Sequence, residues 1–172
     1  MISKAKKIKL VVLDVDGTLT EGTIFLDNEG IETKAFNVRD GFAIVNAIKE
    51  GIEFGIITGR KSALVEKRAE ELGIKYVFQG IGNKAVKLQE LLEDLKLTME
   101  EVAYMGDDIN DLSVIKLVGL SGAPKDACSE VLSKALMITE ASGGKGAVRE
   151  FLEFILKAQN KWENIIKRYE GI

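Results

Sequence analysis

Histidine is absent from the chain of 172 residues, and cysteine and proline each occur only once. Without histidine the chain cannot use a Ser-His-Asp or Cys-His mechanism, a histidine general base or a histidine metal ligand. The single cysteine, Cys128, excludes an intramolecular disulfide and argues against a structural zinc site, so a reducing cytoplasm is the expected location. Any chemistry must therefore use carboxylates, lysine, arginine, hydroxyl groups and a hard metal ion.

A basic excess and long apolar runs are missing too. The 24 Lys and Arg residues against 27 Asp and Glu residues give a net charge of −3, which argues against a nucleic-acid-binding surface. No apolar run approaches the ~18 residues that span a bilayer. The start of the chain has the lysines and apolar stretch of a secretory signal, but Asp14 and Asp16 interrupt it and no small-residue cleavage site follows. We expect one domain, residues 1–172, without a nucleic-acid or membrane partner.

Short β-branched runs alternate with segments of helical periodicity along most of the chain, which predicts an α/β fold with a doubly wound, Rossmann-like parallel sheet. The expected sheet strands are 9–15, 53–57, 75–78 and 101–105, with short candidates at 118–121 and 135–138. The expected helices are 41–50, 62–72, 84–95, 110–117 and 147–158, and the tail 159–172 is a possible helical extension. Residues 23–26 and 31–36 flank a turn sequence and predict a β-hairpin flap at about 21–36.

Asp14 and Asp16 follow the first expected strand. Their spacing places both side chains on one side of an extended chain, and Gly17 permits a sharp turn after them. Two carboxylates so close repel each other, so a divalent cation is the natural companion. By itself the pattern is equally compatible with two solvated loop aspartates.

Two later positions could hold an anion. Thr58 and Arg60 follow a strand and precede a helix, so a hydroxyl and a guanidinium can meet phosphate oxygens there. Lys84 lies at the start of a helix, where the helix dipole disfavours a positive charge. An adjacent anion would explain its position. The alternatives are a strand-end cap with a surface arginine, and an ordinary surface lysine.

A third acidic segment follows the strand at 101–105. Asp107, Asp108 and Asp111 lie within five residues and again suggest a cation. An acidic N-cap of the next helix explains one or two of these carboxylates but not all three. Ligands of parallel sheets bind at the carboxyl ends of the strands, where Asp14, Thr58 and Asp107 are each expected.

Four features follow one another along the chain: the segment DVDGT, the Thr58 of ITGR, Lys84 and the segment GDDIND. In this order they resemble the four motifs of the haloacid dehalogenase superfamily of phosphohydrolases. The resemblance implies that Asp14 is a nucleophile that forms an aspartyl-phosphate, and that Asp16 is the general acid and base. It also implies that Thr58 and Lys84 hold the phosphoryl oxygens.

The same resemblance implies a Mg²⁺ ion bound by Asp14, by the backbone carbonyl of Asp16 and by Asp107. Asp108 and Asp111 are implied to lie outside this ligand set or to be alternative ligands. The spacings from Asp16 to Thr58 and from Thr58 to Lys84 leave no room for a cap domain. An open site of this kind needs cover from neighbouring subunits.

Three longer segments carry a closer resemblance. They are KAFNVRDG at 34–41, ITGRK at 57–61 and GGKGAVRE at 143–150, and they resemble the capless 3-deoxy-D-manno-octulosonate 8-phosphate phosphatases. This resemblance implies a cytoplasmic homotetramer of lipopolysaccharide synthesis, with the hairpin at its centre and a C-terminal tail that can reach a neighbour's site. The implied substrate contacts are Asp16, Asn37, Val38, Arg39, Asp40, Gly41, Arg60, Arg68 and Lys84. Val45 stands where relatives have an arginine. The glycines at 143–146 suggest a flexible anion-facing loop or, alternatively, a plain loop that leads into a helix.

The expected substrate is a phosphorylated sugar acid, and Arg39, Arg60, Arg68 and Lys84 form a suitable cationic set. An alternative is the 9-phosphate of a nine-carbon acylneuraminate or deaminated neuraminate. A phosphomutase is disfavoured because it needs a cap. A non-catalytic oligomeric regulator would have lost Asp14, Asp16, Lys84 or Asp107, and all four are present.

Overall fold

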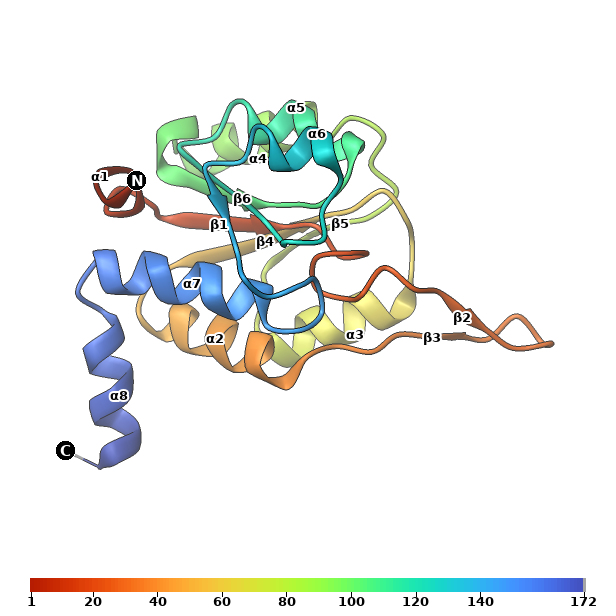
Figure 1. Ribbon diagram of the computed structural model, residues 1–172, viewed down its shortest axis with the longest axis horizontal. Helices are drawn as coiled ribbons and strands as arrows, with labels where there is room; N and C mark the ends of the chain where they lie inside the picture. The colour runs from red at the N-terminus through yellow and green to blue at the C-terminus, as the bar shows by residue number, and fades with distance from the viewer. Residues whose placement is uncertain (172) are drawn as a thin grey trace.

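A six-stranded parallel sheet forms the centre of the molecule in the computed structural model, which describes residues 1–171 (Figure 1). Its strand order is β5-β4-β1-β6-β7-β8. The strands are β1 Leu10–Leu13, β4 Glu53–Ile57, β5 Tyr76–Phe78, β6 Val102–Met105, β7 Leu120–Ala123 and β8 Met137–Ile138. This confirms the doubly wound α/β fold. Residues 1–171 contain no cap domain and no helix that is both long and apolar enough to cross a membrane.

Helices cover both faces of the sheet, and alternate side chains of each central strand pack against them. Val11 and Leu13 belong to the core under α2 (Val38–Lys49), α3 (Ala63–Leu72) and α7 (Ala147–Ala158). Leu10 and Val12 belong to the core under α4 (Lys84–Leu95), α5 (Leu112–Ile115) and α6 (Ser129–Leu132). Burial on both sides explains why these strands are continuous apolar runs.

The winding of the sheet reverses beside β1. From β1 the chain passes outward to β4 and β5, and then returns past β1 to β6 and onward to β7 and β8. Leu13 therefore pairs with Ile56 on one side and with Met105 on the other. The residues that follow β1, β4 and β6 meet at the carboxyl edge of the sheet, where such folds bind ligands.

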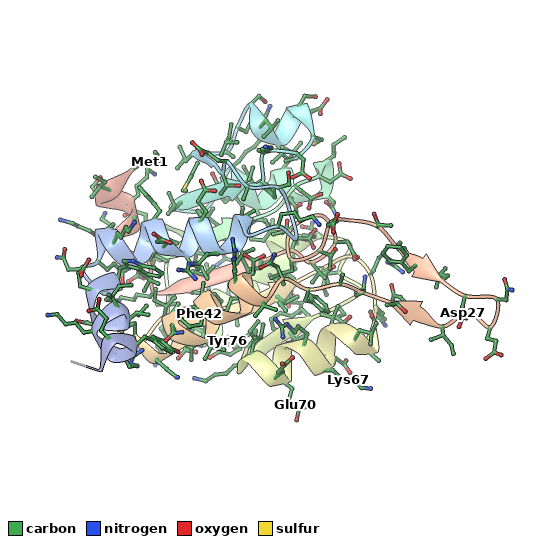
Figure 2. The ribbon with its side chains drawn as sticks, turned by 60° about the horizontal axis from the view of Figure 1, so that its bottom comes forward. Met1, Asp27, Phe42, Lys67, Glu70 and Tyr76 are labelled. Atoms are coloured by element: carbon green, nitrogen blue, oxygen red, sulfur yellow. The ribbon has the colours of Figure 1, made fainter. Side chains whose placement is uncertain are left out.

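The hairpin of β2 (Phe25–Leu26) and β3 (Glu32–Thr33) projects from this edge, and Asp27 lies near its tip (Figures 1 and 2). The carboxylate of Asp27 closes the turn by accepting hydrogen bonds from the N–H groups of Glu29 and Ile31 at 2.9 and 2.8 Å. The predicted hairpin is confirmed, but its paired strands are shorter than expected. It has no sheet to pack against within this chain, and an isolated two-stranded ribbon is only marginally stable.

Two helix boundaries differ from the prediction. The helix expected at 41–50 begins at Val38, because the Asn37 side chain accepts hydrogen bonds from the N–H groups of Arg39 and Asp40. The helix expected at 110–117 is instead a 3₁₀ turn, η2 (Ile109–Asp111), followed by the single turn α5. Asp111 causes this change, because its carboxylate accepts hydrogen bonds from backbone N–H groups of the preceding loop. The short helices α1 (Ile2–Ala5) and α6, and the 3₁₀ turn η1 (Met99–Glu101), have no counterpart in the prediction.

The tail forms a helix, α8 (Trp162–Glu170), whose last turns contact α2 of its own chain. Trp162 and Ile165 are buried, Arg168 pairs with Glu50 at 2.5 Å, and the ring of Tyr169 lies 5.0 Å from that of Phe42. The predicted helical extension is confirmed for these residues, while Ile172 lies outside the described residues.

Candidate active site

A pocket of about 160 Å³ opens where β1, β4 and β6 end. Its lining comes from the three strand-end segments and consists of Asp14, Asp16, Thr58, Gly59, Arg60, Asp107, Asp108 and Asn110. The structure thus brings together most of the residues that were predicted to carry the chemistry. Thr58 follows β4 and is buried. Its N–H donates to the carbonyl of Phe78 at the end of β5, and its carbonyl accepts from the N–H of Ile81 in the loop after β5.

Asp14 and Lys84 form a buried ion pair behind this pocket. The Lys84 Nζ lies 2.9 Å from the Asp14 Oδ1, and the two side chains are 1% and 6% exposed. Burial, followed by the charge of Asp111, raises the pKa of Asp14 to about 6, while Lys84 acts in the opposite direction. Burial alone would lower the pKa of Lys84, but the charges of Asp14 and Asp111 outweigh it and raise the pKa above its ordinary value. Lys84 is therefore a permanently charged group.

Asp111 is the second partner of Lys84, at 2.6 Å. Its Oδ1 also accepts a hydrogen bond from the Tyr104 hydroxyl at 2.5 Å. Its Oδ2 accepts from the N–H groups of Asp107 and Asp108 at 2.9 and 3.1 Å. With both oxygens engaged, Asp111 anchors Lys84 and the loop after β6. The sequence analysis missed Tyr104 because it lies inside an apolar strand; a buried phenol in such a run was the only signal.

The carboxylates of Asp14 and Asp107 fit a hard divalent cation. One carboxylate oxygen each from Asp14, Asp107 and Asp111 lie within 4.8 Å of one another. Burial, and then the charges of Asp14 and Asp111, raise the pKa of Asp107 to about 7, as expected for acids that face each other. Oxygen ligands of this kind are those that Mg²⁺ prefers.

Gly17 makes this arrangement possible. A Cβ at this position would lie 2.0 Å from the Asp107 Oδ2, and the φ angle of +91° is one that other residues rarely adopt. The loop is tightened further by Val15, whose carbonyl accepts from the N–H groups of Thr18, Leu19 and Thr20. Thr18 in turn donates from its hydroxyl to the Asp107 Oδ1 at 3.0 Å.

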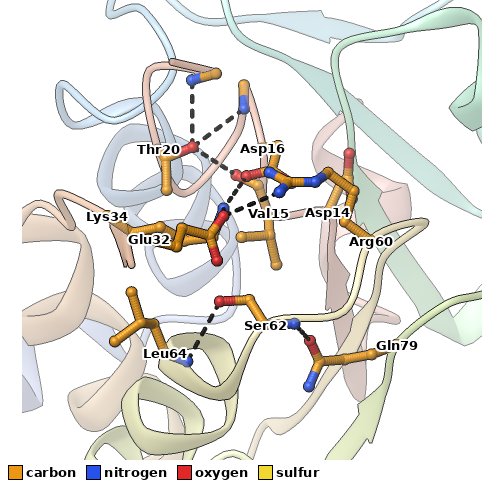
Figure 3. A network of polar contacts seen from close by, with 12 residues as sticks. Asp14, Val15, Asp16, Thr20, Glu32, Lys34, Arg60, Ser62, Leu64 and Gln79 are labelled. Carbon is orange, nitrogen blue, oxygen red and sulfur yellow. Dashed lines mark hydrogen bonds and ion pairs between the residues drawn. The ribbon is translucent and has the colours of Figure 1, made fainter. Parts of the chain in front are cut away.

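Asp16 is more exposed than Asp14 and belongs to a network of charges at the pocket mouth (Figure 3). Its Oδ1 lies 2.5 Å from the Lys34 Nζ, and its Oδ2 lies 3.7 Å from Arg60. Glu32 lies 3.3 Å from Lys34 and 3.0 Å from Arg60. Glu32 and Lys34 were not predicted to belong to the site; their opposite charges two residues apart, in the segment expected as the second strand of the hairpin, were the available signal.

The remaining predicted substrate contacts lie away from this pocket. Asn37 donates to the Gly144 carbonyl at 3.2 Å, and Arg68 reaches the Asn37 carbonyl at 3.5 Å and Glu71 at 2.8 Å. Gly41 packs against Arg68, whose guanidinium would be 2.4 Å from a Cβ there.

Asp40 is 1% exposed and faces the start of α7, where its Oδ1 accepts from the Arg149 N–H at 2.7 Å. Val38 and Arg39 are exposed, and Arg39 lines a separate pocket of about 420 Å³ along α7. Within one chain, therefore, none of residues 37–41 lines the pocket of Asp14.

The glycine-rich loop before α7 packs on the loop that follows β1. A Cβ on Gly143 would lie 1.8 Å from the Gly17 carbonyl oxygen, and one on Gly144 would lie 2.6 Å from the backbone of Thr20 and Glu21. The Gly144 N–H donates to the Thr18 carbonyl at 3.0 Å. These glycines permit close backbone contact, so the loop is packed. It leads into α7, as in the second of the two expectations, and is not the flexible anion-facing loop of the first.

The comparisons with known proteins agree with this geometry. Residues 77–152 match the model of the haloacid dehalogenase-like hydrolases. The 3-deoxy-D-manno-octulosonate 8-phosphate phosphatase KdsC of Escherichia coli strain K12 is 48% identical over 161 residues, which cover 94% of this chain and 86% of that protein. The phosphatase of the same name from Yersinia pestis is 47% identical over 163 residues, covering 95% and 87%.

Solved structures give the same result. The 3-deoxy-D-manno-octulosonate 8-phosphate phosphatase of Moraxella catarrhalis, in complex with a magnesium ion, a phosphate ion and a KDO molecule, superposes with a TM-score of 0.96 at 42% identity, covering 98% of this chain and 97% of that one. A probable YrbI family phosphatase of Pseudomonas syringae has a TM-score of 0.96 at 48% identity, covering 98% and 96%. The chain belongs to the 3-deoxy-D-manno-octulosonate 8-phosphate phosphatase family of the haloacid dehalogenase-like hydrolases.

Proposed function

We propose that this protein hydrolyses 3-deoxy-D-manno-octulosonate 8-phosphate to the free sugar acid and inorganic phosphate, with Mg²⁺ as cofactor, in lipopolysaccharide biosynthesis. The observation that carries the proposal is the buried pair of Asp14 and Lys84 beside Asp107, in a chain 48% identical to phosphatases of that name over 94% of its length. The free thiol of Cys128 suits a cytoplasmic location.

In the first step the Asp14 carboxylate attacks phosphorus. A bond forms between its oxygen and phosphorus, the bond from phosphorus to the sugar oxygen breaks, and Asp16 gives its proton to that oxygen. In the second step Asp16 takes a proton from water, whose oxygen attacks phosphorus and restores Asp14. Lys84, 2.9 Å from Asp14, offsets the repulsion between the carboxylate and the phosphate dianion, and the Thr58 hydroxyl donates to a phosphoryl oxygen.

Mg²⁺ would be held by Asp14, Asp107 and the backbone carbonyl of Asp16, and it would supply positive charge next to the phosphoryl group. Asp111 is excluded from this set in our proposal because its oxygens already accept hydrogen bonds from Lys84, Tyr104 and two backbone N–H groups.

The pocket of about 160 Å³ accommodates a phosphoryl group but is small beside the roughly 300–1,000 Å³ of sites that enclose whole ligands. The sugar must therefore extend past Arg60 to the surface. We propose that neighbouring subunits enclose it, and that the exposed Val38 and Arg39 contact the sugar acid in a neighbour's site. This accounts for their distance from Asp14 within one chain.

The exposed apolar side chains of the hairpin support a homotetramer. Ile24, Phe25, Leu26 and Ile31 are 43%, 56%, 64% and 58% exposed, and a ribbon of this kind favours burial against other copies. For the tail to reach a neighbour's site, α8 must leave α2 and break the pair of Arg168 and Glu50. Deletion of residues 159–172 should then change turnover, and unchanged kinetics on all substrates would exclude a role for the tail.

Phosphate release from a panel of substrates tests the proposed function. The eight-carbon sugar-acid 8-phosphate should have the highest kcat/KM, by at least about 10-fold over a nine-carbon acylneuraminate 9-phosphate, since differences of one or a few groups are worth about 10- to 200-fold. Activity should require Mg²⁺. The relatives' names favour the eight-carbon substrate, and a preference for the nine-carbon ester would overturn the assignment.

A further inference from the structure

Lys34 is a buried cation whose charge is directed at Asp16. It follows β3 at the base of the hairpin, and only 1% of its side chain is exposed. Its Nζ lies 2.5 Å from the Asp16 Oδ1 and 3.3 Å from the Glu32 Oε1. Lysine is almost never this buried without paired charges, because its desolvation is costly. Asp16 and Glu32 provide that pairing.

Four side chains of alternating charge form a ring, in the order Asp16, Lys34, Glu32 and Arg60 (Figure 3). Arg60 lies 3.0 Å from the Glu32 Oε1 and 3.7 Å from the Asp16 Oδ2. A hydrogen bond from the Ser62 side chain, together with Lys34 and Arg60, holds the pKa of Glu32 below its ordinary value. Glu32 therefore stays ionised and keeps both cations next to Asp16.

This ring affects the two oxygens of Asp16 differently. Oδ1 is occupied by Lys34 at hydrogen-bond distance, whereas Oδ2 lies 3.7 Å from Arg60, beyond that distance. Oδ2 is thus the oxygen left to carry the transferable proton. When Asp16 gives up this proton, it becomes negative in a pocket that Asp107 also lines, beside the phosphoryl group that the proposed mechanism transfers to Asp14. A cation on Oδ1 stabilises that new charge.

We propose that Lys34 is a positioning residue for general acid catalysis: it fixes the orientation of Asp16 and stabilises the carboxylate that remains after the proton has moved to the leaving oxygen. The inference rests on the proposed function, in which Asp16 is the acid. Because Lys34 lies at the base of the hairpin, it also links the order of the hairpin to catalysis.

The leaving group distinguishes this role from simple structural support. An alkoxide needs a proton as it departs, whereas 4-nitrophenolate departs without one. In Lys34→Met, kcat/KM for glycerol 2-phosphate should fall by about 10- to 100-fold, part of the about 10²–10⁴-fold that general acid–base catalysis contributes. For 4-nitrophenyl phosphate it should fall by less than about 3-fold. Neither ester has a carboxylate, so the difference reports on proton donation and not on recognition of the sugar acid.

Two further variants serve as controls. Lys34→Arg keeps the positive charge and should recover most of the activity toward glycerol 2-phosphate. Lys75→Met removes a lysine that pairs with Glu53 at 3.0 Å, at the end of β4 opposite to the pocket, and it should leave both activities unchanged. Equal losses on the two esters in Lys34→Met, or no loss on either, would overturn the role of Lys34. Absence of Mg²⁺-dependent release of phosphate from 3-deoxy-D-manno-octulosonate 8-phosphate by the wild-type protein would instead overturn the proposed function.

Discussion

The ion pair of Asp14 and Lys84 depends on residues that never reach the pocket. Asp111 holds the lysine, and Tyr104 holds Asp111 through a hydrogen bond of 2.5 Å. Burial raises the pKa of Tyr104 well above its ordinary value, so its hydroxyl remains a donor. Asp14 could be predicted from its place at the end of a strand, and Lys84 from its place at the start of a helix. Tyr104 could not, because it lies within an apolar strand and its pairing with Asp111 depends on how the loop after β6 turns back.

Tyr104→Phe removes this donor without changing the shape of the core. We expect kcat to fall by about 10-fold or more, because a hydrogen bond to a charged group contributes about 1.5–3 kcal/mol. Tyr76→Phe, on the edge strand β5, is the matched control and should have wild-type kcat. Equal kcat in the two variants would show that Tyr104 does not support Lys84.

Asp40 gives the folded protein a specific dependence on pH. It is 1% exposed, and its Oδ2 is buried without a hydrogen-bond partner in the described part of the chain. Burial raises its pKa from 3.8 to about 6, against the effect of the Arg149 and Gly146 N–H groups. The folded state thus binds this proton more tightly than the unfolded chain. The resulting stability is fully present below pH 3.8 and is lost as the pH rises through about 6.

Asp40→Asn should abolish that dependence. We expect the unfolding free energy of the wild type, relative to Asp40→Asn, to fall by about 1–3 kcal/mol as the pH rises from about 4 to about 7.5. Denaturant titrations at a fixed protein concentration measure this difference. Parallel stability curves for the two proteins would contradict the account of Asp40.

At the scale of the elements, local patterns predicted the alternation of strands and helices but not the contacts between them. The Asp40 of α2 takes the place of a capping side chain for α7, because Gly146 at the α7 N-cap has none. Asp111 replaces a regular helix start with a 3₁₀ turn. The first contact joins segments that are far apart in the chain, and the second depends on the geometry of a loop. Neither can be predicted from a short stretch of sequence.

The loop before α7 is in close backbone contact with the loop that follows β1, and a substitution can test this contact. Gly143→Ala would bring a Cβ to 1.8 Å from the Gly17 carbonyl oxygen, so backbone must move. We expect a loss of about 1–3 kcal/mol in stability, as in overpacked cores, together with reduced kcat. Gly82→Ala, whose Cβ would meet nothing within 4 Å, should be close to neutral in both measurements. A Gly143→Ala protein with wild-type kcat would show that the loops are not coupled.

At the scale of the whole molecule, the small open pocket and the bare apolar hairpin point to an assembly. The sequence predicted the hairpin from its turn, and the absence of a cap from the short spacings between motifs. It could not show that residues 37–41 lie outside the pocket of their own chain, since that depends on how α2 is placed.

Phe25→Lys with Leu26→Lys should disrupt the assembly. The wild type should have the mass of four 18.9 kDa chains, and the double variant should sediment as smaller species with reduced kcat/KM for the sugar-acid phosphate. Val86→Lys changes an apolar side chain of α4 that is 53% exposed, and it should leave the mass unchanged. A wild-type protein that sediments as a stable monomer would contradict the proposal of shared sites.

In the proposed mechanism, Asp14 attacks the phosphorus of a sugar-acid phosphate. The most direct measurement is Mg²⁺-dependent phosphate release from 3-deoxy-D-manno-octulosonate 8-phosphate by the wild type and by Asp14→Asn, with fold and mass compared by circular dichroism and sedimentation. We predict rapid release by the wild type, and a loss of at least about 10³-fold in an Asp14→Asn protein with unchanged fold and mass, because no covalent intermediate can form. Substantial Mg²⁺-dependent release by that variant would contradict the account.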